Sequence, residues 1–166
     1  MYQEGDCAAS LRLSDRLFAL YPLSARAWEG QMVAARCYLA NQQAEEAINA
    51  YRRIAYHAPN GEFAQTAGET LLKMTVMTRD IDLVTKEART LRERFTGETV
   101  ERFTLMEEAK ALQGGGESYY PKAIAMLRNV QERWPDSPEA KSAVESVREM
   151  RTSVIPPDWL KLDGGL

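Results

Sequence analysis

Apolar residues recur every three or four positions along most of the chain, and short polar turns separate the stretches that carry them. Ala47, Ile48, Tyr51, Ile54 and Ala55 follow one such face. This spacing is typical of an amphipathic α-helix. The same pattern predicts eight helices, at about residues 3–20, 24–40, 43–57, 61–78, 80–95, 97–113, 119–134 and 137–151. An all-α fold is therefore expected.

The turns between the predicted helices recur at a nearly fixed interval. The equivalent turn position is occupied by Pro22, Pro59, Thr96 and Pro135, at spacings of 37, 37 and 39 residues. Self-similarity at a period of 20 to 50 residues indicates a helical repeat protein, in which each helix pair stacks on the next. The best-formed copy of the repeat lies at residues 41–67.

Residues at the predicted helix ends agree with this division. Ser24, Asn60, Asp80 and Ser137 are expected to cap helix N-termini, since their side chains can accept hydrogen bonds from free backbone amides. Pro138 follows Ser137 at the favoured first helical position. The run of three glycines at 114–116 predicts the turn inside the last pair, because glycine does not favour continuation of a helix.

The predicted domain covers residues 1–151. It comprises a lone helix at 3–20, pairs at 24–57, 61–95 and 97–134, and a closing helix at 137–151. The lone helix resembles the second member of a pair. Three interpretations stay open: the chain is part of a longer repeat protein, this helix is an edge that some other element covers, or this helix is a cap.

Small and aromatic residues at fixed positions resemble the consensus of the tetratricopeptide repeat family. The matching positions are Ala35, Tyr38, Ala47, Tyr51 and Pro59 in the first pair, Tyr120, Ala123 and Pro135 in the last pair, and Gly5, Leu17 and Pro22 around the lone helix. This resemblance implies a right-handed superhelical solenoid of antiparallel helix pairs that binds other proteins. The period exceeds the usual 34 residues of the family, and Thr96 replaces the turn proline.

The longer period, with a Pro-x-Ser start to a pair at Pro135, is similar to a bacterial envelope subgroup of the same family. That subgroup includes the lipoprotein of the β-barrel assembly machinery and the periplasmic coordinator of the Tol-Pal system. The resemblance implies a place in a multiprotein envelope assembly. It favours a periplasmic or outer-membrane-associated protein, with a cytoplasmic one as the alternative.

A candidate binding surface follows from the repeat register. Positions fourteen residues after three of the turn positions are all basic: Arg36, Lys73 and Lys110. If the first helices of the pairs line a concave groove, these cations would bind a peptide carboxylate or acidic side chains. The predicted groove residues are Met32, Arg36, Leu39, Glu69, Lys73, Val76, Met106 and Lys110. The alternative is an ordinary solvated helix face, on which Glu69 and Lys73 form an i,i+4 pair.

Two parts of this surface have a second interpretation. Met32 and Met106 could form an adaptable binding surface or fill gaps in the core. The tail at 152–166 breaks the repeat at Pro156-Pro157, and Trp159 lies within it. We expect a strap that folds back over the last helix; a ligand for a neighbouring molecule and a disordered end are the alternatives.

Composition excludes several functional classes. The chain is 45% hydrophobic and 27% charged, with a net charge of −3, which fits a folded protein without a nucleic-acid footprint. Its apolar runs are too short to span a membrane. The single histidine, His57, stands near a helix end, and no catalytic, phosphate-binding or metal-binding motif is visible. We therefore expect a non-enzymatic protein with no catalytic residue, cofactor or metal.

The two cysteines, Cys7 and Cys37, belong to no metal or redox motif. They are interpreted either as free thiols that pack as small hydrophobes or as a disulfide between adjacent helices. The predicted function is a module that binds a peptide or a segment of a partner protein. The alternatives are a scaffold that self-associates as a homo-oligomer through the solenoid ends, and a cytoplasmic adaptor or secretion chaperone.

Overall fold

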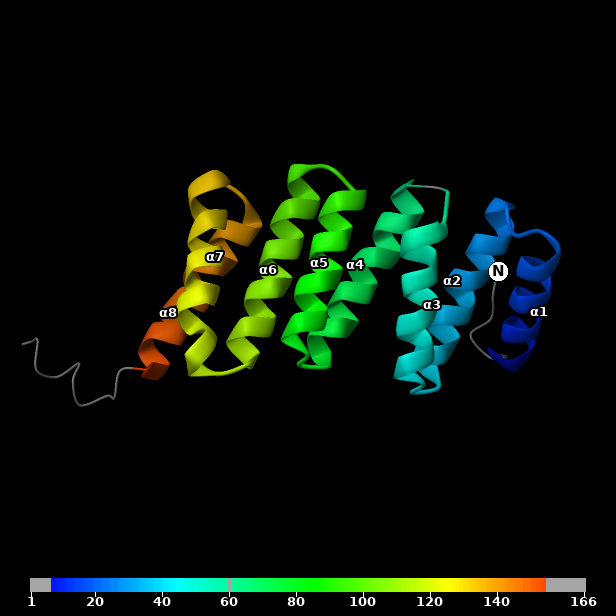
Figure 1. The fold of residues 1–166 in the computed structure, drawn as a ribbon, viewed down its shortest axis with the longest axis horizontal. Helices are drawn as coiled ribbons and strands as arrows, with labels where there is room; N and C mark the ends of the chain where they lie inside the picture. The colour runs from blue at the N-terminus through cyan, green and yellow to red at the C-terminus, as the bar shows by residue number, and fades with distance from the viewer. Residues whose placement is uncertain (1–6, 60, 155–166) are drawn as a thin grey trace, which may run out of the picture. The chain divides into compact units, whose positions relative to one another are not determined.

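The computed structural model describes residues 7–59 and 61–154, and every regular element in these residues is helical. Eight α-helices follow one another with short turns between them (Figure 1). They are α1 (Cys7–Leu20), α2 (Ala25–Ala40), α3 (Ala44–His57), α4 (Gly61–Met77), α5 (Ile81–Arg94), α6 (Glu98–Gly114), α7 (Tyr120–Arg133) and α8 (Pro138–Val154), with a 3₁₀ turn at Glu117–Tyr119 before α7. The predicted all-α fold with eight helices is confirmed for this part of the chain.

The chain divides into two compact units, which we call unit one (Met1–Met74) and unit two (Thr75–Leu166). In unit one, α2 packs against both α1 and α3. In unit two, α6 packs against α5 and α7, α7 packs against α8, and α6 also contacts α8. Consecutive helices run in opposite directions within each unit (Figure 1). Such packing of adjacent antiparallel helices agrees with a helical repeat.

A backbone conformation with positive φ recurs at the turn inside each helix pair. Gln42, Arg79 and Gly116 have φ angles of 60°, 61° and 104°, and they are spaced 37 residues apart. A positive φ reverses the chain sharply after a helix, and it costs energy for any residue other than glycine. The 37-residue period seen in the sequence therefore has a backbone counterpart at the turn between paired helices.

Two of the predicted caps form as expected. Asp80 Oδ1 accepts a hydrogen bond from the Leu83 amide at 2.9 Å, and Ser137 Oγ accepts one from the Ala140 amide at 3.1 Å. Ser24 lies at the N-cap of α2 without a side-chain cap bond. Asn60 lies outside the described residues.

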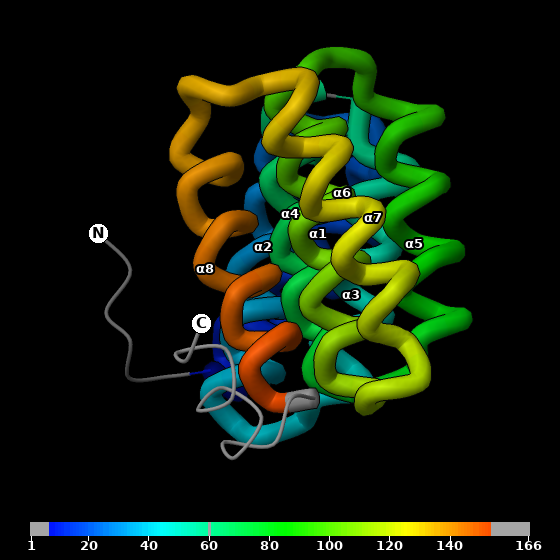
Figure 2. Tube along the Cα trace, turned by 90° about the vertical axis from the view of Figure 1, so that its left-hand side faces the viewer, coloured from blue at the N-terminus to red at the C-terminus, as the bar shows by residue number. Residues whose placement is uncertain are grey.

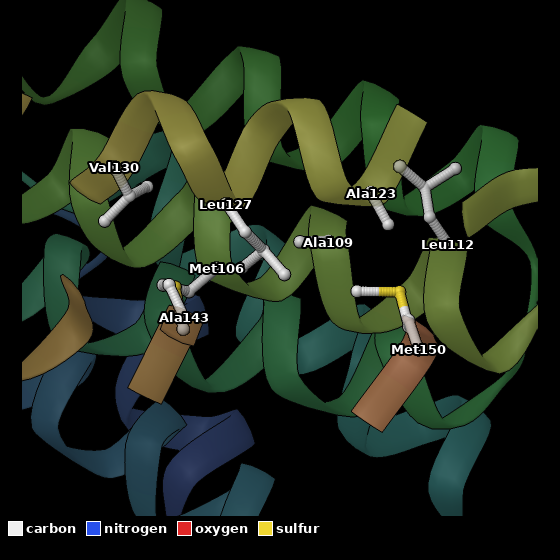
Figure 3. Packing of buried hydrophobic residues seen from close by; sticks show 8 residues of the cluster. All are labelled: Met106, Ala109, Leu112, Ala123, Leu127, Val130, Ala143 and Met150. Carbon is white, nitrogen blue, oxygen red and sulfur yellow. The ribbon is translucent and has the colours of Figure 1, made fainter. Parts of the chain in front are cut away.

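The core of unit two gathers small and large apolar side chains from three helices (Figure 3). Met106, Ala109 and Leu112 come from α6, Ala123, Leu127 and Val130 from α7, and Ala143 and Met150 from α8. In Figure 2 the coils of α7 and α8 lie beside each other, and α6 touches both. Alanines at the centre let the three helices approach closely, while Leu127 and Met150 fill the remaining space.

The glycine turn after α6 has a specific packing reason at Gly115. A Cβ at this position would stand 2.6 Å from Cδ1 of Ile81, at the start of α5. Gly115 therefore allows the end of α6 to pack against the neighbouring helix. The predicted turn at 114–116 is present, with Gly114 as the last residue of α6.

The last helix is longer than predicted. It continues to Val154, three residues beyond the expected end at Arg151. Within this extension the Thr152 hydroxyl donates to the Arg148 carbonyl oxygen at 3.1 Å, a local bond that fits helical geometry. Residues 152–154, which were expected to begin the tail, therefore belong to α8, and the rest of the predicted strap of residues 152–166 lies outside the described residues.

Candidate protein-interaction site

The predicted groove residues divide between the two units. Arg36, Lys73 and Glu69 belong to unit one, and Lys110 and Met106 belong to unit two. The three basic residues are exposed on their own helices. Each is therefore accessible to a ligand within its unit.

Arg36 interacts with a buried tyrosine. The guanidinium of Arg36 on α2 forms a hydrogen bond with the Tyr51 hydroxyl on α3. Burial raises the pKa of Tyr51, since the phenolate would lose its hydration, and the nearby charge and hydrogen bond of Arg36 act in the opposite direction. Arg36 therefore helps to join α2 to α3.

The other polar candidates also have local partners. Lys110 Nζ donates to Glu107 Oε1 at 2.6 Å, one turn away on α6. Gln65 Nε2 donates to Glu69 Oε1 at 3.0 Å on α4. Both are partly buried contacts between neighbouring residues of one helix, and such local pairs contribute little to stability.

The apolar candidates differ in their exposure. Met32 and Met106 were expected on the binding surface or in the core, and the structure buries both, at 6% and 7% exposure. Met106 is part of the core cluster of unit two. The prediction that these two methionines line an exposed groove is therefore wrong, and the core interpretation holds, because their helices turn them toward neighbouring helices. Leu39 is 38% exposed, and Val76 is half-buried.

The two cysteines form a disulfide. Cys7 and Cys37 join α1 to α2 with their Cα atoms 5.3 Å apart. The alternative of two free thiols is thereby corrected. Phe18 and Trp28 pack edge to face across the same helix pair, with ring centroids 4.9 Å apart. A covalent bond and an aromatic contact therefore join α1 to α2 in unit one.

Large apolar side chains are exposed on α1 and on the turn that follows it. Leu13, Leu20 and Tyr21 are about 60% exposed, and Leu23 is 90% exposed. The hydrophobic pattern of the sequence did not predict this surface. A signal was present, because Leu11, Leu13, Leu17, Phe18 and Leu20 cover more than one side of a helix and cannot all face α2.

A hollow lies between α1 and α2, and the exposed Leu13 forms part of its lining. It is shallow, with a cavity volume of about 30 Å³, and it opens to solvent. The lining residues are Ser10, Leu13, Ser14 and Leu17 of α1, with Gly30 and Val33 of α2. Ser14 is buried and accepts a hydrogen bond from Gln31 Nε2 at 3.1 Å. The lining thus combines three small residues, Ser10, Ser14 and Gly30, with the apolar side chains of Leu13, Leu17 and Val33.

A charged cluster joins helices in unit two. Arg133 donates to both carboxylate oxygens of Glu101, at 2.9 Å for Nη2, and its Cζ lies 4.2 Å from the Trp134 ring centroid. The hydrogen bond and charge of Arg133 lower the pKa of Glu101. This arrangement is structural, since each charged group has a partner within the fold.

Among residues 7–59 and 61–154, no group of three or more His, Cys, Asp or Glu is placed to hold a metal ion. None of the helices in these ranges is long and apolar enough to cross a membrane. Comparison of the chain with protein-family models, with curated proteins and with solved structures finds no match.

Proposed function

We propose that this protein is a non-enzymatic interaction module, built as a right-handed solenoid of the tetratricopeptide type, that binds a segment of another protein. The helical repeat supports the proposal, because stacked helix pairs offer extended surfaces for binding. The 37-residue recurrence of a positive φ angle adds backbone evidence for the repeat itself.

The observation that carries the proposal is the exposed apolar surface on α1 and the following turn. Four large apolar residues lie within eleven positions there, Leu13, Leu20, Tyr21 and Leu23, each at least 60% exposed. Single exposed apolar residues are ordinary, but four of them within eleven positions support a protein–protein contact. The exposed cations Arg36, Lys73 and Lys110 are proposed to recognise acidic groups of the bound segment.

The Cys7–Cys37 disulfide favours one compartment for this activity. Structural disulfides persist in oxidising compartments, such as the bacterial periplasm, and are rare in the cytosol. We therefore propose a module of an envelope assembly in preference to a cytoplasmic adaptor or secretion chaperone.

The proposal is tested by photo-cross-linking in the producing cells. A photoreactive amino acid replaces Leu23, and in a matched strain it replaces Glu145, an exposed residue of α8. A light-dependent adduct with another protein at position 23, absent at position 145, is the expected result. An adduct that contains only a second copy of the chain would instead establish the self-associating scaffold. Absence of any adduct at position 23 would refute the interaction function.

A further inference from the structure

The hollow between α1 and α2 has a filled counterpart in unit two. There, α6 lies against both α7 and α8. Its side chains Met106, Ala109 and Leu112 pack into the core cluster with residues of those two helices (Figure 3). The pair α7–α8 therefore forms a seat that a third helix occupies.

The repeat register shows that α1–α2 presents the same seat. Aligning the turn prolines Pro22 and Pro135 places α1 on α7 and α2 on α8. The residues Ser10, Ser14, Leu17 and Gly30 then correspond in order to Ala123, Leu127, Val130 and Ala143. All four residues of the first set line the hollow, and all four of the second set belong to the core cluster beside α6.

The two seats differ in what covers them. Val130 and Ala143 have no exposed surface, and Leu127 is 2% exposed. In unit one, Ser14 is buried at 3% exposure, but Leu17 is only half-buried, and Leu13 at the edge of the hollow is 61% exposed. Within the described residues, the surface that α6 covers in unit two is thus partly open in unit one.

We propose that the hollow between α1 and α2 is a docking site for an acidic amphipathic helix of another protein, which takes the place that α6 has against α7 and α8. This inference rests on the proposed interaction function and assigns it a site and a class of partner. The contact follows the helix-in-groove mode, in which apolar side chains at helical spacing enter a hydrophobic groove.

The floor of the seat indicates the size of the residue that enters it. Ser10, Ser14 and Gly30 stand where unit two has an alanine, a leucine and an alanine. Each is smaller than or similar to its counterpart, and Ser14 lacks most of the volume of Leu127. The partner helix therefore needs a large apolar residue where α6 has Ala109, because an unfilled space loses packing contacts.

The charges around the seat indicate the character of the partner's flanks. Residues three and four apart on a helix are surface neighbours, so Arg16 adjoins Leu13 and Leu20, and Arg26 adjoins Gly30. Together α1 and α2 carry Arg12, Arg16, Arg26 and Arg36 against only Asp15 and Glu29, although acidic residues predominate in the chain as a whole. The helix α6 itself carries four glutamates, one arginine and one lysine. Acidic flanks therefore suit this seat.

The disulfide explains how the open seat keeps its shape. Cys7 and Cys37 are the register equivalents of Tyr120 and Met150, which belong to the packing around α6 in unit two. In unit one a covalent bond joins these two positions. It holds α1 against α2 without a third helix, and such preorganisation lowers the cost of binding.

The α6 sequence provides the probe for this site. A capped 17-residue peptide of Glu98–Gly114, and a second peptide with Ala109→Leu, are titrated into the full chain. Binding is followed by chemical-shift changes of the methyl groups of Leu13, Leu17 and Val33. We expect saturable binding of both peptides, several-fold tighter for the Ala109→Leu peptide, and weaker at high salt because arginine–glutamate attraction is screened.

Two variants of the chain locate the binding. Leu13→Glu places a negative charge at the edge of the seat and should weaken binding by roughly tenfold or more, since a carboxylate loses hydration there. Val144→Glu introduces the same charge on an exposed residue of α8, in unit two, that does not line the hollow, and it should leave the affinity unchanged. Both variants should keep the wild-type melting temperature, because neither side chain is buried.

Four results would overturn the assignment. These are absence of binding up to the peptide solubility limit, equal binding by the Leu13→Glu chain, a wild-type dimer that Leu13→Glu converts to monomer, and tighter peptide binding after deletion of residues 1–6 or 155–166. The third would assign the seat to a second copy, and the fourth to a terminal segment of the chain itself. If the peptide does not bind but cross-links at position 23 persist, the docking site is refuted and the proposed interaction function is retained. Absence of those cross-links refutes the interaction function itself.

Discussion

Arg92 on α5 reaches across to Glu108 on α6, with Nη1 2.5 Å from Oε2. The same nitrogen donates to Thr104 Oγ1 at 3.0 Å, and the Thr104 hydroxyl is in turn bonded to the Val100 carbonyl oxygen at 2.8 Å. The Glu108 side chain is 7% exposed, whereas that of Arg92 is 29% exposed. The carboxylate is therefore the group that depends on its partner for stabilisation.

This asymmetry predicts unequal effects of removing the two partners. Arg92→Met leaves a buried carboxylate without its donor and should cost about 2–4 kcal/mol of unfolding free energy. Glu108→Leu should cost less, because Arg92 still reaches water and Thr104. The double variant should recover most of the loss. Urea denaturation of all three proteins measures the coupling, with Arg128→Met as an exposed control, and equal losses for both single variants would contradict the interpretation.

The disulfide predicts a reductant-sensitive stability. Cys7 and Cys37 lie 30 residues apart, so their bond restricts a sizeable loop in the unfolded chain. Reduction should therefore lower the unfolding free energy by about 2–4 kcal/mol. It should also speed amide exchange in α1, which loses its covalent attachment to α2. The double variant Cys7→Ala, Cys37→Ala is the control, since its melting temperature should not respond to reductant. A wild-type melting temperature that also ignores reductant would contradict the prediction.

The repeated positive φ predicts stabilising glycine substitutions. Gln42 and Arg79 occupy a left-handed conformation that costs about 1–2 kcal/mol for an L-residue, partly offset by the greater unfolded-state entropy of glycine. Gln42→Gly and Arg79→Gly should each stabilise the protein by about 0.5–1 kcal/mol. Ala125→Gly, at an exposed position in the interior of α7, should destabilise it by about 1 kcal/mol. Thermal denaturation distinguishes the two directions, and destabilisation at 42 and 79 would show that the turn tolerates the original residues without strain.

The sequence predicted the helices well because their information is local. Apolar spacing, the caps at Asp80 and Ser137, and the glycines at 114–116 act within one or two turns of chain. The register of the repeat was equally accessible, since Pro22, Pro59 and Pro135 mark the same backbone turn.

The surface was harder to predict, because exposure depends on which neighbour covers each helix face. Met32 and Met106 share the periodicity of surface candidates, yet adjacent helices bury both. Leu13 and Leu20 have the composition of core residues, yet they are exposed. The pairing of Cys7 with Cys37 likewise depended on a Cα separation of 5.3 Å that periodicity does not specify.

The buried Tyr51 predicts a loss of stability at alkaline pH. Its pKa in the folded protein lies above the ordinary value of 10.0, chiefly because burial disfavours the phenolate. The protonated form is thus favoured by folding, so this contribution is fully present below pH 10 and is lost as the pH rises through the folded pKa. Tyr51→Phe should remove that part of the alkaline loss, whereas Tyr21→Phe, at an exposed tyrosine, should not.

Arg36 provides the second half of this test, because its charge and hydrogen bond lower the pKa of Tyr51 against the effect of burial. Arg36→Leu should therefore raise the pKa of Tyr51 further. Ultraviolet absorbance of tyrosinate, followed against pH in the wild type and in Arg36→Leu, with Tyr51→Phe to assign the signal, measures the shift. A lower or unchanged Tyr51 pKa in Arg36→Leu would contradict the stabilisation of the Tyr51 phenolate by Arg36.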